Sequence, residues 1–468
     1  MVELIERSAT ELADMIRNRK ISCEETLDAF LAQVVKWNPV INAVVSECRD
    51  EARQTAKQLD EKLDKGEEIG VLGGLPIAHK DLVQTEGLRT TWGSRIYADF
   101  IPSSDDLIVQ RLKSAGAVTI GKTNTPEFGA GSQTFNEVFG ATRNPYDRTR
   151  TVGGSSGGAA AALAARMIPI ADGSDMGGSL RNPASFCNVI GFRSSTGLVP
   201  VWPTDEAWFG YSVQGPMART VEDIALQLQA TVGFDRRVPL SLHATPADFA
   251  GALGCEMKGL RIAYSRTLGG LPVDPAVIEV LDQAVLKLQD CGMDVVEVDP
   301  DLHGADEVFK TWRAYRFAMK FGPLIERSPE LVKDTIHWNV NEGRKLSAKD
   351  LARANELRTQ LFERMTEFMG LYDYLLCPTV QTPPFDIDVP YLESINDVKF
   401  DTYVDWMKSC YLITVTGLPA LSMPAGFTEN GLPVGIQLVG GYHADRAVLD
   451  FAHEVESILQ FASRAPVL

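Results

Sequence analysis

The sequence lacks the marks of a secreted, metal-binding or membrane-spanning protein. Its 468 residues include seven cysteines, scattered and without a C-x-x-C pair, which argues for reduced thiols and against a cysteine metal site. No apolar run is long enough to cross a bilayer. The first 20 residues, MVELIERSATELADMIRNRK, contain no apolar stretch typical of a signal peptide. We therefore expect a cytoplasmic protein.

Positive charge is also scarce. Lys and Arg number 45 against 62 Asp and Glu residues, which gives a formal net charge of −17. A surface of that sign repels nucleic acid and anionic membranes, so we expect neither as a partner. His79 has no second His or Cys nearby at a spacing typical of metal ligands, so no metal site is expected around it.

Helical and strand patterns alternate along the chain. Two capping boxes begin an amphipathic helical pair in residues 8–35. Further on, predicted strands at Leu260–Ser265 and Val295–Val298 flank an amphipathic helix at Asp274–Asp290, which is a βαβ-like unit. With 45% hydrophobic residues the chain can build a large core. The alternation predicts an α/β fold with a mostly covered central sheet.

A glycine-rich stretch, Thr151 to Ala184, dominates the middle of the chain. It holds two Gly-Gly-Ser turns that end at Ser155 and Ser179, separated by a predicted Ala-rich helix at Gly158–Arg166 and a strand at Met167–Ala171. A loop–helix–strand–loop unit can fold back and bring its two loops together. The two serine hydroxyls would then lie side by side on backbone that glycine allows to approach a ligand closely.

The second turn favours binding of a negative charge. Consecutive backbone N–H groups in a glycine-rich turn form a nest for anions, and residues 176–179 stand just before a predicted helix start. Such a nest suits the oxyanion that develops during acyl transfer. A single Gly-Gly-Ser turn is more often an ordinary turn, but two of them framing a helix favour a functional site.

Two familiar motifs fit the first turn less well. Residues 153–157 match the G-x-S-x-G nucleophile elbow, but that elbow should follow a strand directly and residues 147–151 are polar. The glycine-rich run is also not followed by Lys-Ser or Lys-Thr, so it is not a phosphate loop.

Lys80 stands at the end of a predicted buried strand, Leu75–Ala78, which is an unusual place for a charge. This segment alone favours a structural lysine, ion-paired with a neighbour such as Asp81. A functional lysine is the alternative.

Five ordered segments together resemble the amidase signature hydrolases over most of the chain. The segments are GLPIAHKD around Lys80, TVGGSSGG around Ser155, GSDMGGSLRNPASFCNVIGF around Ser179, SVQGPMARTVED at 212–223 and TGLPALSMPAGFTENGLPVGIQLVG at 416–440. The resemblance implies one large mixed central β-sheet covered by helices on both faces. It also implies a single domain, with a helical segment at 1–65, a core at about 66–230 and 370–468, and an inserted α/β and helical region at about 231–370.

The same resemblance implies the catalytic residues of an amidase without metal or organic cofactor. Ser179 would be the nucleophile, and Ser155, after a cis peptide bond at Gly154–Ser155, would link it to Lys80 as the base. A lysine must be neutral to accept a proton, and burial lowers its pKa. The backbone N–H groups of Met176, Gly177, Gly178 and Ser179 would form the oxyanion hole. Asp175 and Arg181 would pair and brace the loop.

The sequence departs from the family pattern at three positions. Met176 stands where the family often has Thr, Asp172 is an acid where an apolar residue is commoner, and Asn182 replaces a usual aliphatic residue. These changes bear on the substrate more than on the reaction. Family members are often homodimers through N-terminal helices, and the helical pair in residues 8–35 allows a homodimer here.

Aromatic residues in the predicted pocket loops favour an apolar acyl or aryl amide as the small-molecule substrate, with a carbamate or a nylon-like oligoamide as further options. The pocket residues that we predict are Phe128, Ser132, Phe135, Trp202 and Trp208. One alternative is the glutaminase subunit of a tRNA-dependent amidotransferase, which needs a partner chain. Another is a non-catalytic relative that binds amides or acts as a scaffold, although Lys80, Ser155 and Ser179 are all present.

Overall fold

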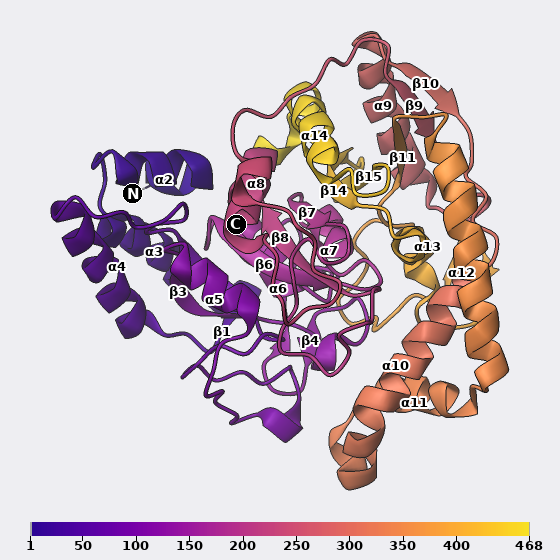
Figure 1. Ribbon diagram of the computed structural model, residues 1–468, viewed down its shortest axis with the longest axis horizontal. Coiled ribbons are helices and arrows are strands. Elements are labelled where there is room, and N and C mark those ends of the chain that lie inside the picture. The colour runs from indigo at the N-terminus through magenta and orange to yellow at the C-terminus, as the bar shows by residue number, and fades with distance from the viewer. Residues whose placement is uncertain (1, 468) are drawn as a thin grey trace.

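The computed structural model describes residues 2–467 and is built on one sheet of eleven strands (Figure 1). In spatial order the strands are β1 (Val44–Val45), β3 (Val118–Thr123), β2 (Pro76–Lys80), β6 (Ile170–Asp175), β8 (Val213–Ala218), β7 (Ile190–Arg193), β14 (Ala420–Phe427), β15 (Pro433–Val439), β11 (Tyr374–Pro378), β9 (Arg261–Tyr264) and β10 (Asp294–Glu297). The sheet is mixed: β3, β2 and β6 are parallel, as are β11, β9 and β10, and the strands between them are antiparallel. Two short hairpins, β4 (Phe135–Asn136) with β5 (Gly140–Ala141) and β12 (Ser394–Ile395) with β13 (Val398–Lys399), lie outside it.

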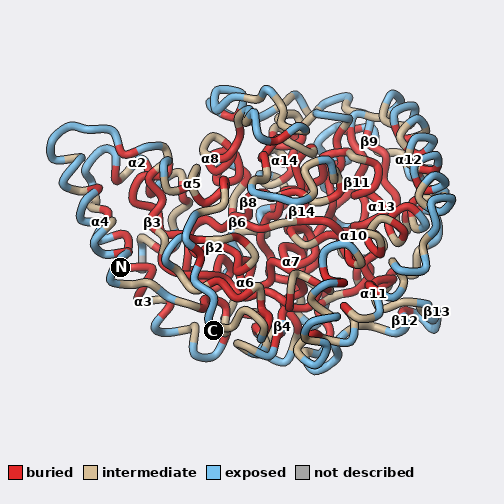
Figure 2. The backbone as a smooth tube through the Cα atoms, turned by 60° about the horizontal axis from the view of Figure 1, so that its bottom comes forward, coloured by how far each residue is buried: buried red, intermediate tan, exposed pale blue. Residues whose placement is uncertain are grey.

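Helices cover both faces of this sheet. Successive residues of a strand point to opposite faces, and along β11 Leu375 and Cys377 enter one apolar cluster while Leu376 enters another. The Leu376 face is covered by α8 (Val221–Thr231), α9 (Pro275–Asp290) and α14 (Asp445–Leu459), and the opposite face by α6 (Gly157–Ala164), α7 (Arg181–Phe186) and α13 (Lys408–Thr416). Figure 2 shows the buried segments concentrated in these central elements. The predicted α/β architecture, a large mixed sheet covered on both faces, is confirmed.

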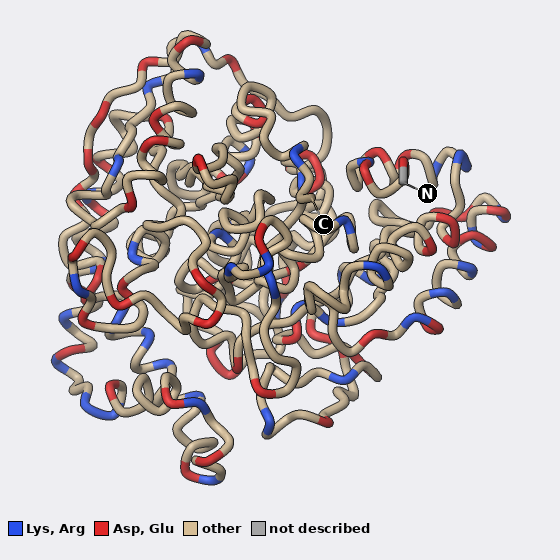
Figure 3. The backbone as a smooth tube through the Cα atoms, turned by 180° about the vertical axis from the view of Figure 1, so that it is seen from behind, with Lys and Arg blue, Asp and Glu red and all other residues tan. Residues whose placement is uncertain are grey.

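The remaining helices lie toward the two ends of the sheet (Figure 1). Near β1 and β3 are α1 (Val2–Glu6), α2 (Ala9–Arg17), α3 (Cys23–Ile41), α4 (Arg49–Asp64) and α5 (Leu107–Ser114); toward the other end are α10 (Ala305–Arg327), α11 (Asp334–Lys345) and α12 (Ala348–Met369). The region predicted as an insertion, about 231–370, adds β9 and β10 to the same sheet. Acidic and basic residues are interspersed along the outer helices (Figure 3). No helix in residues 2–467 is long and apolar enough to span a membrane.

The capping boxes predict helix starts well. Ser8 caps α2 and Ser22 caps α3. In each box the carboxylate of the glutamate three residues later accepts a hydrogen bond from the backbone N–H of the capping serine. Each box satisfies two N–H groups that the first helical turn would otherwise leave unpaired.

One strand prediction was wrong in position. The strand expected at Met167–Ala171 is β6, which runs from Ile170 to Asp175. Arg166 takes a left-handed backbone conformation with φ 58°, and Met167 N–H closes the turn onto Ala162. The helix therefore ends at Ala164, two residues before the predicted end, and a turn fills the residues up to Pro169. The strand then continues through polar residues to Asp175, just before the second Gly-Gly-Ser turn.

Candidate active site

Lys80 is the last residue of β2 and is completely buried. Its Nζ lies 2.8 Å from Oγ of Ser155, 2.8 Å from Oγ of Ser156 and 3.0 Å from Oγ of Ser174. Burial lowers the pKa of Lys80 to about 7, against the opposing charges of Asp175 and Asp172. The amine is therefore partly neutral near neutral pH and contacts only hydroxyl groups at its tip.

The structural alternative for Lys80, an ion pair with Asp81, does not form. The carboxylate of Asp81 instead accepts the backbone N–H of Thr91, and the hydroxyl of Thr91 lies 2.5 Å from its Oδ2. Lys80 is therefore not a lysine ion-paired with its neighbour, because β2 places its amine among three serine hydroxyls.

The first Gly-Gly-Ser turn presents Ser155 to Lys80. Its Gly154–Ser155 peptide bond is cis, as the family resemblance implies. The carbonyl oxygen of Ser155 accepts a hydrogen bond from the hydroxyl of Thr125, and that of Gly153 from Thr134. Gly158, in the first turn of α6, packs directly on the backbone of residue 124, where a Cβ would lie 2.3 Å from an amide nitrogen. Only glycine allows that approach, which holds the turn against the strand edge.

The second turn brings Ser179 to the same place. It follows β6, and the backbone N–H of Ser156 donates to the carbonyl oxygen of Ser179 at 3.1 Å. Ser155, Ser174 and Ser179 line a common cavity. The prediction that the two glycine-rich loops meet is thus confirmed by the structure, although the hydroxyls of Ser155 and Ser179 form no direct hydrogen bond within residues 2–467.

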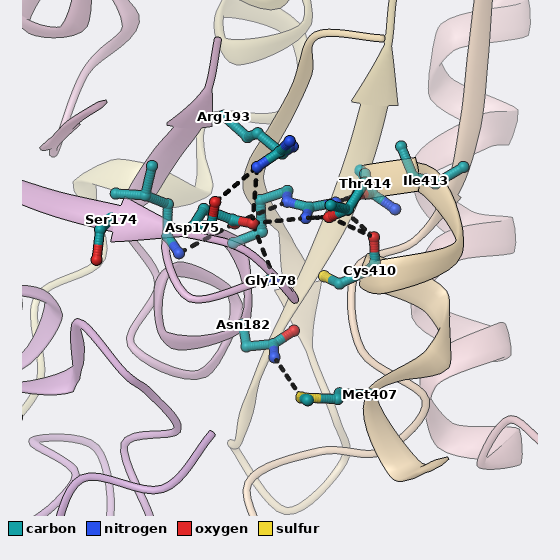
Figure 4. Close-up of polar contacts among 12 residues, drawn as sticks. Ser174, Asp175, Gly178, Asn182, Arg193, Met407, Cys410, Ile413 and Thr414 are labelled. Atoms are coloured by element: carbon teal, nitrogen blue, oxygen red, sulfur yellow. Dashed lines mark hydrogen bonds and ion pairs between the residues drawn. The ribbon is translucent and has the colours of Figure 1, made fainter. Parts of the chain in front are cut away.

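The backbone around Ser179 differs in one respect from the predicted oxyanion hole. The N–H of Gly178 donates to Oδ1 of Asp175 at 3.0 Å, so it is engaged in holding the loop and does not face a substrate oxygen (Figure 4). The N–H groups of Met176, Gly177 and Ser179 have no acceptor within the described chain. Three of the four predicted donors therefore remain available.

Asp175 and Arg181 form the brace that the resemblance implies. Both are fully buried, and Arg181 donates from Nε and Nη2 to the two carboxylate oxygens at 3.0 and 2.9 Å. Arg193 adds a second guanidinium at 3.5 Å, and Arg181 also donates to the Cys410 carbonyl and the Thr414 hydroxyl of α13 (Figure 4). Although burial opposes ionisation, the two arginines hold the pKa of Asp175 well below its ordinary value.

A cavity of about 790 Å³ opens onto these serines. Of the predicted pocket residues, Phe128 and Ser132 line it, together with Phe209. Met407 and one side of α10, which includes Arg313, Arg316, Phe317 and Phe321, complete the wall. No sequence pattern indicates that contribution, because α10 is distant in the chain and shows only an amphipathic helical pattern.

Three pocket predictions were wrong. Trp208 is 78% exposed on a surface loop, and Phe135 is 37% exposed in the β4–β5 hairpin. The ring of Trp202 is covered by the guanidinium of Arg237 at 4.0 Å, outside the cavity lining. Aromatic content marked loops near the cavity, but these three side chains do not line it.

The structure also accounts for two departures from the family pattern. Asp172 accepts the backbone N–H of Lys80 at 2.8 Å, and its other oxygen lies 2.5 Å from Nδ1 of the buried His79. Asn182 donates to the hydroxyl of Ser132 at 3.3 Å beneath the cavity. In residues 2–467 no group of three or more His, Cys, Asp or Glu side chains could hold a metal ion.

Comparison with known proteins agrees with this fold. A family model described as Amidase matches residues 25–449. An acylamidase from Rhodococcus erythropolis is 34% identical over 466 residues, which cover 98% of this chain and 97% of the relative. The A subunit of a glutamyl-tRNA(Gln) amidotransferase from Pseudomonas savastanoi pv. phaseolicola is 34% identical over 484 residues, which cover 97% of this chain and 98% of that relative. The crystal structure of a bacterial aryl acylamidase of the amidase signature family matches with a TM-score of 0.91 and 28% identity, covering 98% of this chain and 99% of that one.

The chain therefore belongs to the amidase signature family and is an amide-hydrolysing enzyme. The acylamidase and aryl acylamidase relatives support an amide-hydrolysing enzyme over the non-catalytic alternative. Enzymes of the family act on small amide substrates.

Proposed function

We propose that this enzyme hydrolyses the C–N bond of apolar acyl or aryl amides through an acyl-enzyme on Ser179, with Ser155 and Lys80 as proton carriers. The observation that supports this proposal best is the environment of Lys80: a buried amine with a pKa near 7 in contact with the Ser155 hydroxyl. An amine in that state can accept a proton, whereas an ordinary lysine at neutral pH cannot.

The proposed proton transfers use the contact between Lys80 and Ser155 and the shared cavity that Ser155 and Ser179 line. Ser179 attacks the amide carbonyl carbon and passes its proton to Ser155, which passes its own proton to the neutral amine of Lys80. The resulting ammonium returns a proton by the same route to the leaving nitrogen, and the C–N bond breaks. Water then attacks the ester carbonyl carbon and gives a proton to Lys80 through Ser155. Lys80 returns that proton by the same route to the Ser179 oxygen as the acyl C–O bond breaks and the acid leaves.

Backbone N–H groups of Gly177 and Ser179, with that of Met176, would stabilise the negative charge on the substrate oxygen. Each such donor is typically worth about 3 kcal/mol in the transition state. The brace between Asp175 and Arg181 keeps these donors in position before the substrate arrives, because Asp175 accepts the N–H groups of Gly178 and Leu180 on either side of Ser179.

The substrate class is supported by the walls of the cavity. Aromatic side chains surround it: Trp92, Tyr97, Phe128, Phe209, Phe317 and Phe321. Rings of this kind favour an apolar acyl chain or an aryl amine over a small polar amide. The similarity to an acylamidase and to an aryl acylamidase supports the same class.

Hydrolysis of 4-nitroacetanilide by wild type and Ser179→Ala tests the proposal. Removal of the nucleophile should lower kcat by about 10⁴-fold or more. Ser212→Ala, which removes a hydroxyl that lines the same cavity without contacting Lys80, should keep kcat within about threefold. Turnover that persists in Ser179→Ala would overturn the assignment of the nucleophile.

The glutaminase subunit of a tRNA-dependent amidotransferase is the second candidate, because such a subunit is 34% identical over nearly the whole chain. It predicts ammonia release from glutamine and little turnover of anilides. A substrate panel in which glutamine alone is hydrolysed would favour it. The homodimer through residues 8–35 also remains a prediction, which the molar mass in solution would test.

A further inference from the structure

Arg313 is a buried guanidinium on the wall of the substrate cavity. It lies on α10, is 7% exposed, and lines the cavity that Ser179 also lines. Its Nη2 donates to the hydroxyl of Tyr403 at 2.7 Å, and its carbon Cζ lies 4.4 Å from the ring centre of Phe317. These neutral partners fix its orientation and do not neutralise its charge.

No carboxylate of the described residues forms an ion pair with Arg313. Its Nε has no hydrogen-bond partner, and Nη1 has no acceptor in residues 2–467. A charged side chain is almost never buried in this way unless it is paired. The chain as a whole carries 62 acidic residues, so a carboxylate is missing only around Arg313.

The other charges near Arg313 do not supply the missing partner. Glu127 is buried, but its oxygens accept the hydroxyl of Ser94 and the backbone N–H of Lys333. Lys333 is a second buried cation, close enough that Arg313 helps burial lower its pKa to about 8. Elsewhere in the cavity Glu206 is paired with Arg316.

The helix also places Arg313 near the reacting centre. Phe309, one turn earlier on α10, packs against Gly177 so closely that a Cβ there would lie 3.0 Å from the Phe309 ring. Residues four apart lie on the same face of a helix and about 6 Å apart along its axis. Arg313 is therefore about one helical turn from the residue that contacts the oxyanion loop.

From this geometry we propose that Arg313 binds a carboxylate carried by the substrate, a few bonds from the scissile amide. The inference rests on the proposed function and narrows it to amides with one anionic end and an otherwise apolar body. A planar carboxylate can accept two parallel bonds from the unpartnered side of a guanidinium, and these bonds strengthen in a cavity that excludes water. Phe317 and Phe321, on the same face of α10, would contact the apolar body.

Three 4-nitroanilides with five-carbon acyl groups test the proposal: glutaryl with a terminal carboxylate, pentanoyl with none, and 5-aminopentanoyl with an ammonium group. Wild type should prefer the glutaryl compound, chiefly through a lower KM. In Arg313→Met the ratio of kcat/KM for glutaryl over pentanoyl should fall about 100-fold. Arg313→Lys should retain part of the preference, because the charge remains and the planar fork is lost.

A second pair places the carboxylate on the amine side: N-acetyl-4-aminobenzoate against N-acetyl-4-toluidine. Preference for the carboxylate in either pair, lost in Arg313→Met, supports the proposal and tells which side of the amide faces α10. Arg327→Met, an exposed arginine at the end of the same helix, should leave both ratios unchanged.

No preference for the carboxylate in either pair, or ratios that are equal in wild type and Arg313→Met, would overturn the proposal. Preference for the ammonium compound would overturn it as well. Neither result would contradict the proposed function. That proposal fails only if wild type hydrolyses none of these anilides, or if Ser179→Ala still hydrolyses them.

Discussion

Two lysines are completely buried on neighbouring strands, Lys80 on β2 and Lys122 on β3. Burial lowers the pKa of both, to about 7 for Lys80 and about 8 for Lys122. Their surroundings differ. Lys80 contacts three serine hydroxyls beside the cavity, whereas Lys122 donates to the carbonyl oxygen of Val83 and to Thr85, 2.8 Å away, in the loop that follows β2.

The strand register explains the difference. In the parallel pair His79 lies opposite Lys122 and Lys80 lies opposite Thr123. Adjacent residues in a strand point to opposite faces, so the two amines lie on opposite sides of the sheet. A depressed lysine pKa therefore does not identify a catalytic base. What distinguishes Lys80 is that its proton can pass to a hydroxyl that faces the substrate cavity.

Lys80→Met gives the largest expected effect and tests whether Lys80, unlike Lys122, takes part in the reaction. Methionine fills the space but cannot accept a proton, so kcat should fall by about 10⁴-fold. The melting temperature should stay the same or rise, because an apolar side chain replaces a buried amine and the hydroxyls of Ser155 and Ser174, which line the cavity, can bond water instead. Anilide hydrolysis and thermal unfolding measure the two effects. Loss of activity through unfolding alone would contradict the assigned role.

Lys122→Met should show the reverse pattern. The carbonyl of Val83 and the hydroxyl of Thr85 would lose a buried donor, which should destabilise the fold by about 1–3 kcal/mol. The kcat of the folded enzyme should change by less than about fivefold, because Lys122 forms no hydrogen bond with Ser155, Ser174 or Ser179 and reaches the cavity wall only through the backbone of Val83. Urea unfolding and kinetics on the same preparation separate the two. A collapse of kcat with unchanged stability would make Lys122 part of the reaction.

The sequence could predict Lys80, Ser155 and Ser179 because ordered local motifs surround each of them. It could also predict the α/β class, since alternating helical and strand patterns depend on local periodicity. The strand β8 was not predicted, because Gly215 and Pro216 within it resemble turn residues. The pocket wall was only partly predictable: Trp208 and Arg313 lie on segments whose side-chain directions are set by packing between distant parts of the chain.

The sequence offered no explanation for an acid at Asp172. In the structure Asp172 lies close to Lys80, so a substitution there can test whether Lys80 is the group that controls the pH dependence of the reaction. Its negative charge raises the pKa of Lys80, as that of Asp175 does, against the larger effect of burial. Because the proposed mechanism needs the neutral amine, kcat/KM of wild type should fall as pH drops below about 7.

In Asp172→Asn the acid limb of the pH profile should move to lower pH by about 1 unit, since loss of a nearby negative charge favours the neutral amine. Asparagine can still accept the N–H of Lys80 and donate to Nδ1 of His79, while the other ring nitrogen of His79 faces Thr119 at 3.1 Å. The shift should therefore reflect the loss of the Asp172 charge and not the loss of its hydrogen bonds. Asp223→Asn, at a buried carboxylate on α8 that accepts the N–H of Thr10, is the matched control and should leave the limb in place. A limb that stays fixed or moves to higher pH in Asp172→Asn would mean that the titrating group is not Lys80, and the contrast with Lys122 would lose its functional meaning.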